Sequence, residues 1–218
     1  MLLIALTGGI ATGKSVVARV FQDHGCYIHA ADDIAHELME PGRPAWEKIV
    51  GHFGEKILNP DQSLNRVILG RIVFADEAER NILNGIIHPL VLDEKRKTIE
   101  RLEKEGRTKI FVSEAALTIE AGFAEFFDKI VVVTCAADIQ IRRLMDRDRL
   151  SREEALRKIG AQMPAGEKTK CADYVIDTSG ALEETLAQAE RVYAKLAEDF
   201  KIKMGLICSS MRRRGAGS

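Results

Sequence analysis

Short apolar runs alternate along the chain with longer segments of helical pattern. The first run, residues 2–6 (LLIAL), has no polar position, which is typical of a strand that is buried on both faces. Apolar residues then recur at helical spacing over 14–24, and Gly25 is a suitable stop for that helix. Four further strands are predicted at residues 26–30, 108–114, 129–134 and 173–177.

Two long helical segments interrupt this series of strands. The second, residues 138–165, is rich in arginine, and an amphipathic helix over 181–200 closes the series. The first covers about 31–105, with breaks predicted near Pro41-Gly42, Asn59-Pro60 and His88-Pro89. Because we find no repeat and no flexible linker, we expect both segments to belong to one domain.

The order of these elements predicts the fold class. Five short strands that alternate with helices form an α/β fold, a doubly wound parallel sheet of about five strands. Ligands of such sheets bind at the carboxyl ends of the strands. We predict one domain over residues 1–205 and a disordered tail over 206–218. The predicted core comprises residues 1–30, 106–137 and 166–205.

The charge balance gives no electrostatic reason for a nucleic-acid or membrane partner. The chain has 218 residues, of which 46% are hydrophobic and 30% charged, and its formal net charge is −1. Nucleic acids and anionic membranes attract strongly basic surfaces. The only dense basic cluster, Arg212–Arg214, lies in the predicted tail. We therefore predict no nucleic-acid partner and no membrane partner.

The cysteines and the apolar runs predict a soluble, cytoplasmic protein. The four cysteines lie far apart without a CxxC pair, which argues against a zinc site or a disulfide framework. The initial MLLIAL lacks the basic region of a signal peptide, and its apolar run ends at Thr7. The apolar run over 130–137 is far too short to cross a bilayer.

A glycine-rich segment, GGIATGKS, follows the first strand and fits the phosphate-loop pattern G-x-x-x-x-G-K-[ST]. Glycines let the backbone curl so that N–H groups face phosphate oxygens, and the following helix adds its positive end. Lys14 can reach the β- and γ-phosphates of a nucleotide, and the Ser15 hydroxyl can bind Mg²⁺. The predicted nucleotide-binding residues are Gly8, Gly9, Ala11, Thr12, Gly13, Lys14, Ser15 and Val16.

The rest of the chain narrows the class of nucleotide-binding protein. A GTPase needs an Asn-Lys-x-Asp segment to read guanine, and the nearest match, TKCA at residues 169–172, lacks the final acid. A large ATPase is expected to have an apolar strand that ends in Asp, whereas KIFVSE ends in Glu114. The chain is also small, so a small-molecule kinase is the leading class.

Asp32 and Asp33 begin the segment after the second predicted strand, at the edge of the sheet where the phosphate loop is expected. Either carboxylate could face the γ-phosphate and take the proton of an acceptor hydroxyl. Both could equally cap the helix DDIAHELME, because carboxylates are favoured at helix starts. Their spacing alone leaves both possibilities open.

Several motifs occur in a fixed order along the chain. They are ALTGGIATGKS, ADDIAHELMEPG, NGIIHPLV, IRRLMDRDRLSREEA, IGAQMP and ADYVID. Over about residues 1–200 this ordered set resembles the dephospho-coenzyme A kinase family. The resemblance implies a P-loop NTPase-type kinase that uses MgATP to phosphorylate the ribose 3′-hydroxyl of dephospho-CoA, the last step of coenzyme A biosynthesis. It also implies that residues 31–105 bind the acceptor and that 138–165 form a lid.

The resemblance further implies roles for single residues on the donor side. Lys14 and Ser15 are the phosphate-loop pair, and Asp32 is the general base. Arg143 and Arg147 are lid arginines, which a helix places on one face at i, i+4. Such arginines stabilise the charge of the transition state. The predicted catalytic residues are therefore Lys14, Asp32 and Arg143, and Arg147 is predicted to contact ATP.

On the acceptor side the resemblance carries over less completely. Ala30 stands where the family has the first acid of an Asp-Ala-Asp pattern, and Ala116 stands where it has a proline. The segment SEAALTIEAGF resembles a variant form of the family's motif, which places Glu114 near the site. The predicted acceptor-binding residues are Asp32, His88, Glu114 and Glu120.

Some alternatives stay open. The acceptor could be another small molecule, such as a nucleoside or a sugar acid, and a nucleotide-dependent switch protein belongs to a different class with the same loop. Lys56, Arg66 and Arg71 could each meet phosphates of the acceptor, and their spacing does not choose among them. We expect a monomer or a weak homo-oligomer.

Overall fold

The structure is a computed structural model that describes residues 1–214, with side chains for all of these except 74 and 206–214. The chain divides into two compact units. The first combines residues 1–29 with those from Glu105 onward, and the second comprises Ala30–Lys104. The second unit differs by one residue at each end from the helical segment that the sequence places at 31–105.

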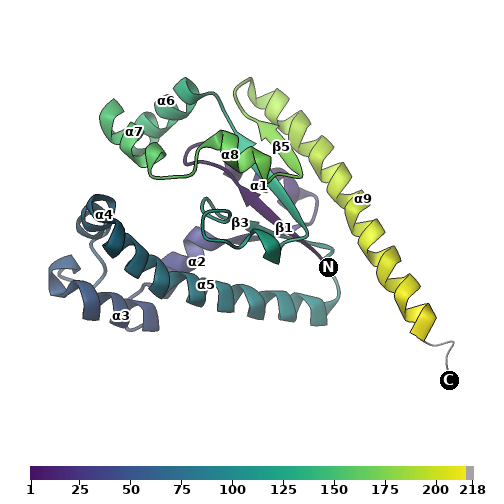
Figure 1. Cartoon of the computed structure of the whole chain (residues 1–218), viewed down its shortest axis with the longest axis horizontal. Helices are drawn as coiled ribbons and strands as arrows, with labels where there is room; N and C mark the ends of the chain where they lie inside the picture. Colours follow the sequence, from purple (N-terminus) through teal and green to yellow (C-terminus); the bar gives the residue numbers. More distant parts are fainter. Residues whose placement is uncertain (215–218) are drawn as a thin grey trace. The chain divides into compact units, whose positions relative to one another are not determined.

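A parallel sheet forms the centre of the first unit (Figure 1). Its strand order is β2-β3-β1-β4-β5, and β1 pairs in parallel with both β3 and β4. The predicted α/β fold with a five-stranded doubly wound sheet is thus confirmed. The strands are β1 (Leu2–Thr7), β2 (Tyr27–Ala30), β3 (Ile110–Glu114), β4 (Lys129–Thr134) and β5 (Tyr174–Asp177).

The apolar residues of β1 alternate between two layers of core. Leu2, Ile4 and Leu6 belong to a cluster that includes residues of α1 and α9, while Ala5 packs with Phe127 on another cluster. A strand covered on both faces needs no polar position, which explains the LLIAL run. The helices of this unit are α1 (Lys14–Asp23), α6 (Ala137–Asp148), α7 (Arg152–Gly160), α8 (Ala165–Lys170) and α9 (Leu182–Arg214), with the 3₁₀ turn η2 (Ala124–Phe126).

The second unit is helical and has its own hydrophobic core. Ile49, Phe53, Leu64 and Leu69 are buried there, with Leu83 packed against them. This core lets the segment fold into a compact body of its own. Its elements are α2 (Ala31–Leu38), α3 (Pro44–Phe53), the 3₁₀ turn η1 (Glu55–Ile57), α4 (Arg66–Ala75) and α5 (Glu77–Glu105).

One predicted helix break is wrong. The long helix α5 continues through Pro89, where the sequence predicts an interruption. Proline removes the N–H that would bond to the carbonyl oxygen four residues earlier, which belongs to Gly85. Gly85 is exposed, so water can satisfy that carbonyl group. The predicted breaks near Pro41-Gly42 and Asn59-Pro60 fall between helices, as expected.

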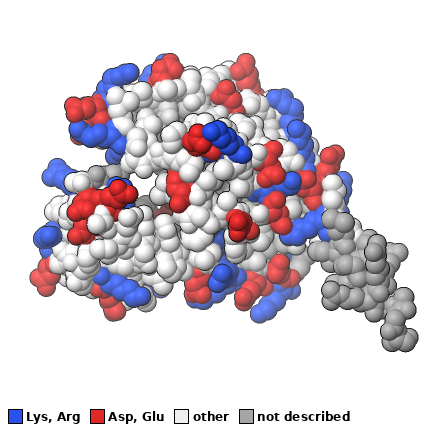
Figure 2. All heavy atoms as spheres, in the orientation of Figure 1, with Lys and Arg blue, Asp and Glu red and all other residues white. Residues whose placement is uncertain are grey.

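The closing helix α9 extends beyond the predicted domain boundary at 205, because its backbone is helical as far as Arg214. Residues 215–218 of the predicted tail lie outside the described residues, and the disorder of the tail stays a prediction. On the face shown in Figure 2, acidic and basic side chains are interspersed. Within residues 1–214, no helix combines the length and the apolar character that a membrane crossing requires.

Candidate active site

The loop between β1 and α1 has a backbone that only glycine can adopt at two positions. Gly8 has φ of 148°, and a Cβ atom there would collide with the carbonyl oxygen of Val133. Gly13 has φ of 89° and lies directly before α1, with Thr178 next to it. The positions of these two glycines in the motif thus follow from close backbone approach and left-handed φ values.

The loop offers several polar groups that could bind an anion. Lys14 Nζ donates to the carbonyl oxygens of Gly8 and Gly9, at 3.0 Å in each case. The N–H groups of Ala11, Gly13 and Ser15 donate to no acceptor among residues 1–214. Ser15 is exposed in the first turn of α1, where the helix dipole is positive. These unused donors and the adjacent ammonium group suit a bound anion.

Arg143 lies next to the loop through a shared threonine. Its guanidinium donates to Thr178 Oγ1 at 2.9 Å and to the Thr178 carbonyl oxygen at 2.8 Å. The Thr178 hydroxyl in turn donates to the carbonyl oxygen of Thr12 at 2.7 Å. Arg143 is therefore connected to the phosphate loop through a single residue, Thr178. Thr178 could not be predicted from the sequence, because its contacts join segments far apart in the chain.

Arg147 is engaged elsewhere. Its Nε donates to Asp148 Oδ1 at 2.8 Å, and its side chain is 56% exposed. Lys158 of α7 also binds Asp148, at 3.1 Å. The Arg147 and Lys158 contacts lower the pKa of the Asp148 carboxyl group, with the Arg147 hydrogen bond as the larger cause. The structure therefore brings Arg143, but not Arg147, to the loop, and the contact of Arg147 with ATP stays a prediction.

The two glutamates predicted beyond β3 occupy different surroundings. Glu114 is the last residue of β3 and pairs in register with Leu6 of β1, at the carboxyl edge of the sheet. Glu120 accepts from the Met163 N–H at 3.1 Å and forms an ion pair with Lys168 at 2.7 Å. Lys168 is fully buried and also donates to the Ala116 carbonyl oxygen at 2.6 Å. Glu120 thus connects the loop after β3 to the segment that follows α7.

We expect Lys168→Met to destabilise the fold by about 3 kcal/mol, because it leaves the mostly buried Glu120 carboxylate without its counter-charge. Urea denaturation measures the free energy of unfolding. Lys170→Met removes an exposed ion pair with Glu167 and is expected to cost less than about 1 kcal/mol. The double variant Lys168→Met/Glu120→Gln should recover part of the loss. Equal losses of unfolding free energy for Lys168→Met and Lys170→Met would show that the buried ion pair of Lys168 with Glu120 does not stabilise the fold more than an exposed pair does.

Asp32 and Asp33 both lie exposed in the first turn of α2. The N-cap position belongs to Ala30, and no side chain caps the helix by a hydrogen bond, so capping by either acid, one of the two possibilities above, is not observed. Neither carboxylate has a hydrogen-bond or ion-pair partner in the part of the chain that the structure describes. Both therefore remain available to bind another group.

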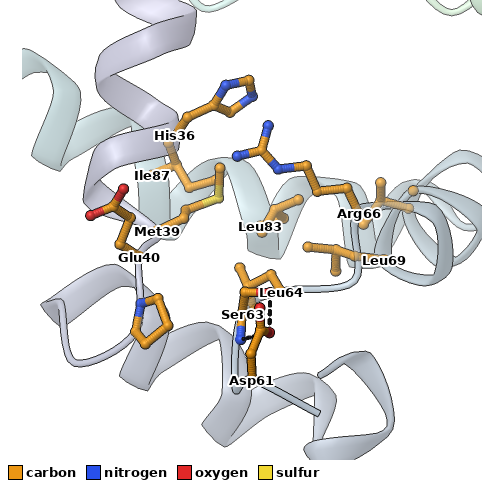
Figure 3. A pocket seen from close by; sticks show the side chains of 13 residues that line it. His36, Met39, Glu40, Asp61, Ser63, Leu64, Arg66, Leu69, Leu83 and Ile87 are labelled. Carbon is orange, nitrogen blue, oxygen red and sulfur yellow. Dashed lines mark hydrogen bonds between the residues drawn. The ribbon is translucent and has the colours of Figure 1, made fainter. Parts of the chain in front are cut away.

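The second unit contains a cavity of about 600 Å³ (Figure 3). Met39, Leu69 and Leu83 give it an apolar lining, and the side chains of His36 and Arg66 point toward one another across it. The Asp61 carboxylate is held by Ser63, whose hydrogen bonds lower its pKa. Of Lys56, Arg66 and Arg71, the three basic residues that the sequence left open, Arg66 alone lines this cavity, and its contact with the acceptor stays a prediction.

His88 lies half-buried on α5, and this burial lowers the pKa of its imidazole. It does not line the cavity. A lowered pKa favours the neutral ring, which can both donate and accept a hydrogen bond. Its predicted acceptor contact stays a prediction.

Among the side chains that the structure describes, no cluster of three or more His, Cys, Asp or Glu residues could hold a metal ion. Magnesium at nucleotide sites keeps several waters and uses one or two protein oxygens together with phosphates of the substrate. The exposed Ser15 hydroxyl beside the loop fits that mode of binding.

Comparison with known proteins identifies one family. The family model for dephospho-CoA kinase matches residues 2–184. A dephospho-CoA kinase from Carboxydothermus hydrogenoformans is 45% identical over 193 residues, which are 88% of this chain and 93% of that relative.

Solved structures agree with this similarity. The dephospho-CoA kinase from Campylobacter jejuni is 28% identical with a TM-score of 0.65, over 90% of this chain and 98% of that one. A shikimate kinase from Acinetobacter baumannii, in complex with shikimate, is 16% identical with a TM-score of 0.51 over 91% of this chain and 94% of its own, which shows a common fold alone.

Proposed function

We propose how this chain, which belongs to the dephospho-CoA kinase family, uses the residues described above in its reaction. The chain has ATP-dependent dephospho-CoA kinase activity, the final step of CoA biosynthesis. The observation that carries the assignment of residues is the phosphate loop, where Ala11, Gly13 and Ser15 offer unused N–H groups beside the Lys14 ammonium.

On the donor side, the loop holds the phosphates of ATP. Lys14 exchanges its contacts with the Gly8 and Gly9 carbonyl groups for oxygens of the β- and γ-phosphates. Thr178 holds the Arg143 guanidinium close to the loop, where it can stabilise negative charge on the transferred group. A fixed cation needs little reorganisation as that charge develops.

Magnesium fits this donor site. Ser15 would supply the protein oxygen for the ion, and oxygens of the β- and γ-phosphates would complete much of its coordination. When bound, the ion supplies charge neutralisation between the two phosphates.

On the acceptor side, the cavity of the second unit receives part of dephospho-CoA. Its apolar lining suits the uncharged arm of that molecule, and Arg66 suits its pyrophosphate, since a guanidinium binds phosphate oxygens bidentately. The ribose 3′-oxygen then attacks the γ-phosphorus, the bond from that phosphorus to the β–γ bridging oxygen breaks, and ADP leaves. Asp32 accepts the proton of the hydroxyl group. The products are CoA and ADP.

Release of ADP, measured with and without dephospho-CoA, tests this function. We expect turnover of the order of 1–100 per second with dephospho-CoA, the usual range for kinases, and only slow ADP release with ATP alone. Turnover as fast with a nucleoside or with shikimate would indicate a different small-molecule kinase. Steady hydrolysis that does not depend on an acceptor would indicate a nucleotide-dependent switch.

We infer further that the protein works in the cytoplasm as a monomer or a weak homo-oligomer. Cys26, Cys135 and Cys171 are free thiols, which suits a reducing compartment. Burial raises the pKa of the Cys26 thiol to about 12, so it stays protonated and unreactive.

A further inference from the structure

The Ile10 peptide of the phosphate loop is bound at both of its polar groups by glutamine side chains. Gln162, which follows α7, accepts the Ile10 N–H through Oε1 at 2.7 Å. Gln140 of α6 donates from Nε2 to the Ile10 carbonyl oxygen at 2.8 Å. A backbone N–H needs an acceptor and a carbonyl group needs a donor, so this orientation of the two amides is the one that satisfies both.

Packing around the two glutamines supports the same arrangement. A Cβ atom at Gly9 would lie 2.6 Å from Gln140 Nε2, so the buried Gln140 amide lies directly against the loop backbone. The side chains of Ile10 and Ala11 pack on the cluster that includes Leu144 of α6 and Ala155 of α7. The outer side of the loop is therefore attached to both helices by hydrogen bonds and by apolar contacts.

The backbone conformation of the loop depends on these contacts. Ala11 has φ of 59°, in the left-handed region that non-glycine residues rarely adopt. Such a conformation persists only where the surroundings hold it in place. The bonds at Ile10 and the apolar contacts of Ala11 provide that constraint.

We propose that Gln140 and Gln162 are positioning residues for ATP: they hold the Ile10 peptide so that the neighbouring N–H groups stay available to the phosphates. Because Gln162 occupies the Ile10 N–H, that group does not bind phosphate, whereas those of Ala11, Gly13 and Ser15 remain. The inference rests on the proposed binding of ATP at this loop. If the proposal is right, ATP affinity depends on whether residue 140 can donate a hydrogen bond to the Ile10 carbonyl oxygen and whether residue 162 can accept one from the Ile10 N–H.

A pair of charge-matched variants tests this dependence. Gln140→Glu and Gln162→Glu each place one carboxylate beside the same peptide. At position 162 the carboxylate still accepts the Ile10 N–H, whereas at 140 it faces a carbonyl oxygen with no proton to donate. We expect Gln140→Glu to raise the Kd for ATP about 10-fold more than Gln162→Glu does.

Neutral variants complete the test. Gln140→Met and Gln162→Met should each raise the KM for ATP while leaving the KM for dephospho-CoA unchanged, and Gln22→Met, at an exposed position of α1, should change neither. Equal effects of the two Glu variants, or a lower melting temperature without a change in ATP affinity, would overturn the inference. The Lys14→Ala variant tests the donor site itself. If it bound ATP as tightly as the wild-type protein does, both the inference and the proposed donor site would be overturned.

Discussion

Replacing Lys14 by alanine should lower kcat by about 10²–10³-fold or more, because each preorganised charge at a phosphoryl-transfer site contributes on that scale. Lys14 Nζ donates to the loop carbonyl oxygens of Gly8 and Gly9. Water can satisfy these two groups when the ammonium is removed. Lys14 is not part of the hydrophobic core of the first unit, so the melting temperature of the Lys14→Ala protein should change little.

The steady-state assay needs a control for general loss of positive charge. Lys201 is an exposed lysine of α9, and Lys201→Ala should retain the wild-type kcat. Circular dichroism of both variants checks that the fold is intact. A folded Lys14→Ala enzyme that keeps more than about a tenth of the wild-type kcat would remove Lys14 from the catalytic residues.

The sheet could be predicted from sequence because its signals are local. A strand such as β4 is apolar at its four central positions, and the boundaries predicted for it, 129–134, are those of the structure. The phosphate-loop motif is similarly local in sequence, and its Gly8 and Gly13 both have positive φ values, which favour glycine. Pro89 shows the opposite case, in which a strong local signal is overridden because the affected carbonyl group reaches water.

The supports of the site could not be predicted, because they join distant segments. Lys168 in sequence is one of many lysines, and only the fold buries it against Glu120. Gln140 and Gln162 carry no motif of their own, and their importance lies in a shared contact with Ile10. Helical spacing placed Arg143 and Arg147 on one face, but it could not show that Asp148 engages the second.

The neighbouring acids of α2 provide the sharpest comparison. Asp32→Asn should lower kcat by about 10²–10⁴-fold, the usual range for a positioned base, whereas Asp33→Asn should leave kcat nearly unchanged. Consecutive residues of a helix point about 100° apart, so only one of the two is expected to face the acceptor. The assignment of Asp32 comes from the family motif, in which it takes the place of the second acid.

The two variants are matched controls for stability. Both acids lie exposed in the first turn of α2, and neither carboxylate has a hydrogen-bond partner in the part of the chain that the structure describes, so each substitution removes one favourable charge from the same helix end. That loss should be about 0.3–1 kcal/mol in both cases, and unfolding curves should therefore coincide. A difference in kcat then reports chemistry and not folding.

The size of the effect depends on how the base acts. A ribose hydroxyl is a far weaker acid than a carboxylic acid, so Asp32 cannot deprotonate it before phosphoryl transfer begins. In a loose transition state the hydroxyl loses its proton late, and Asp32 mainly orients it and then accepts the proton. Asparagine keeps the shape and one carbonyl oxygen but loses the basicity, so kcat should fall while the Kd for ATP stays constant. If Asp33→Asn lost activity and Asp32→Asn kept it, the alignment of this chain with the family motif would be wrong by one residue. Ala30 would then not occupy the position of the family's first acid.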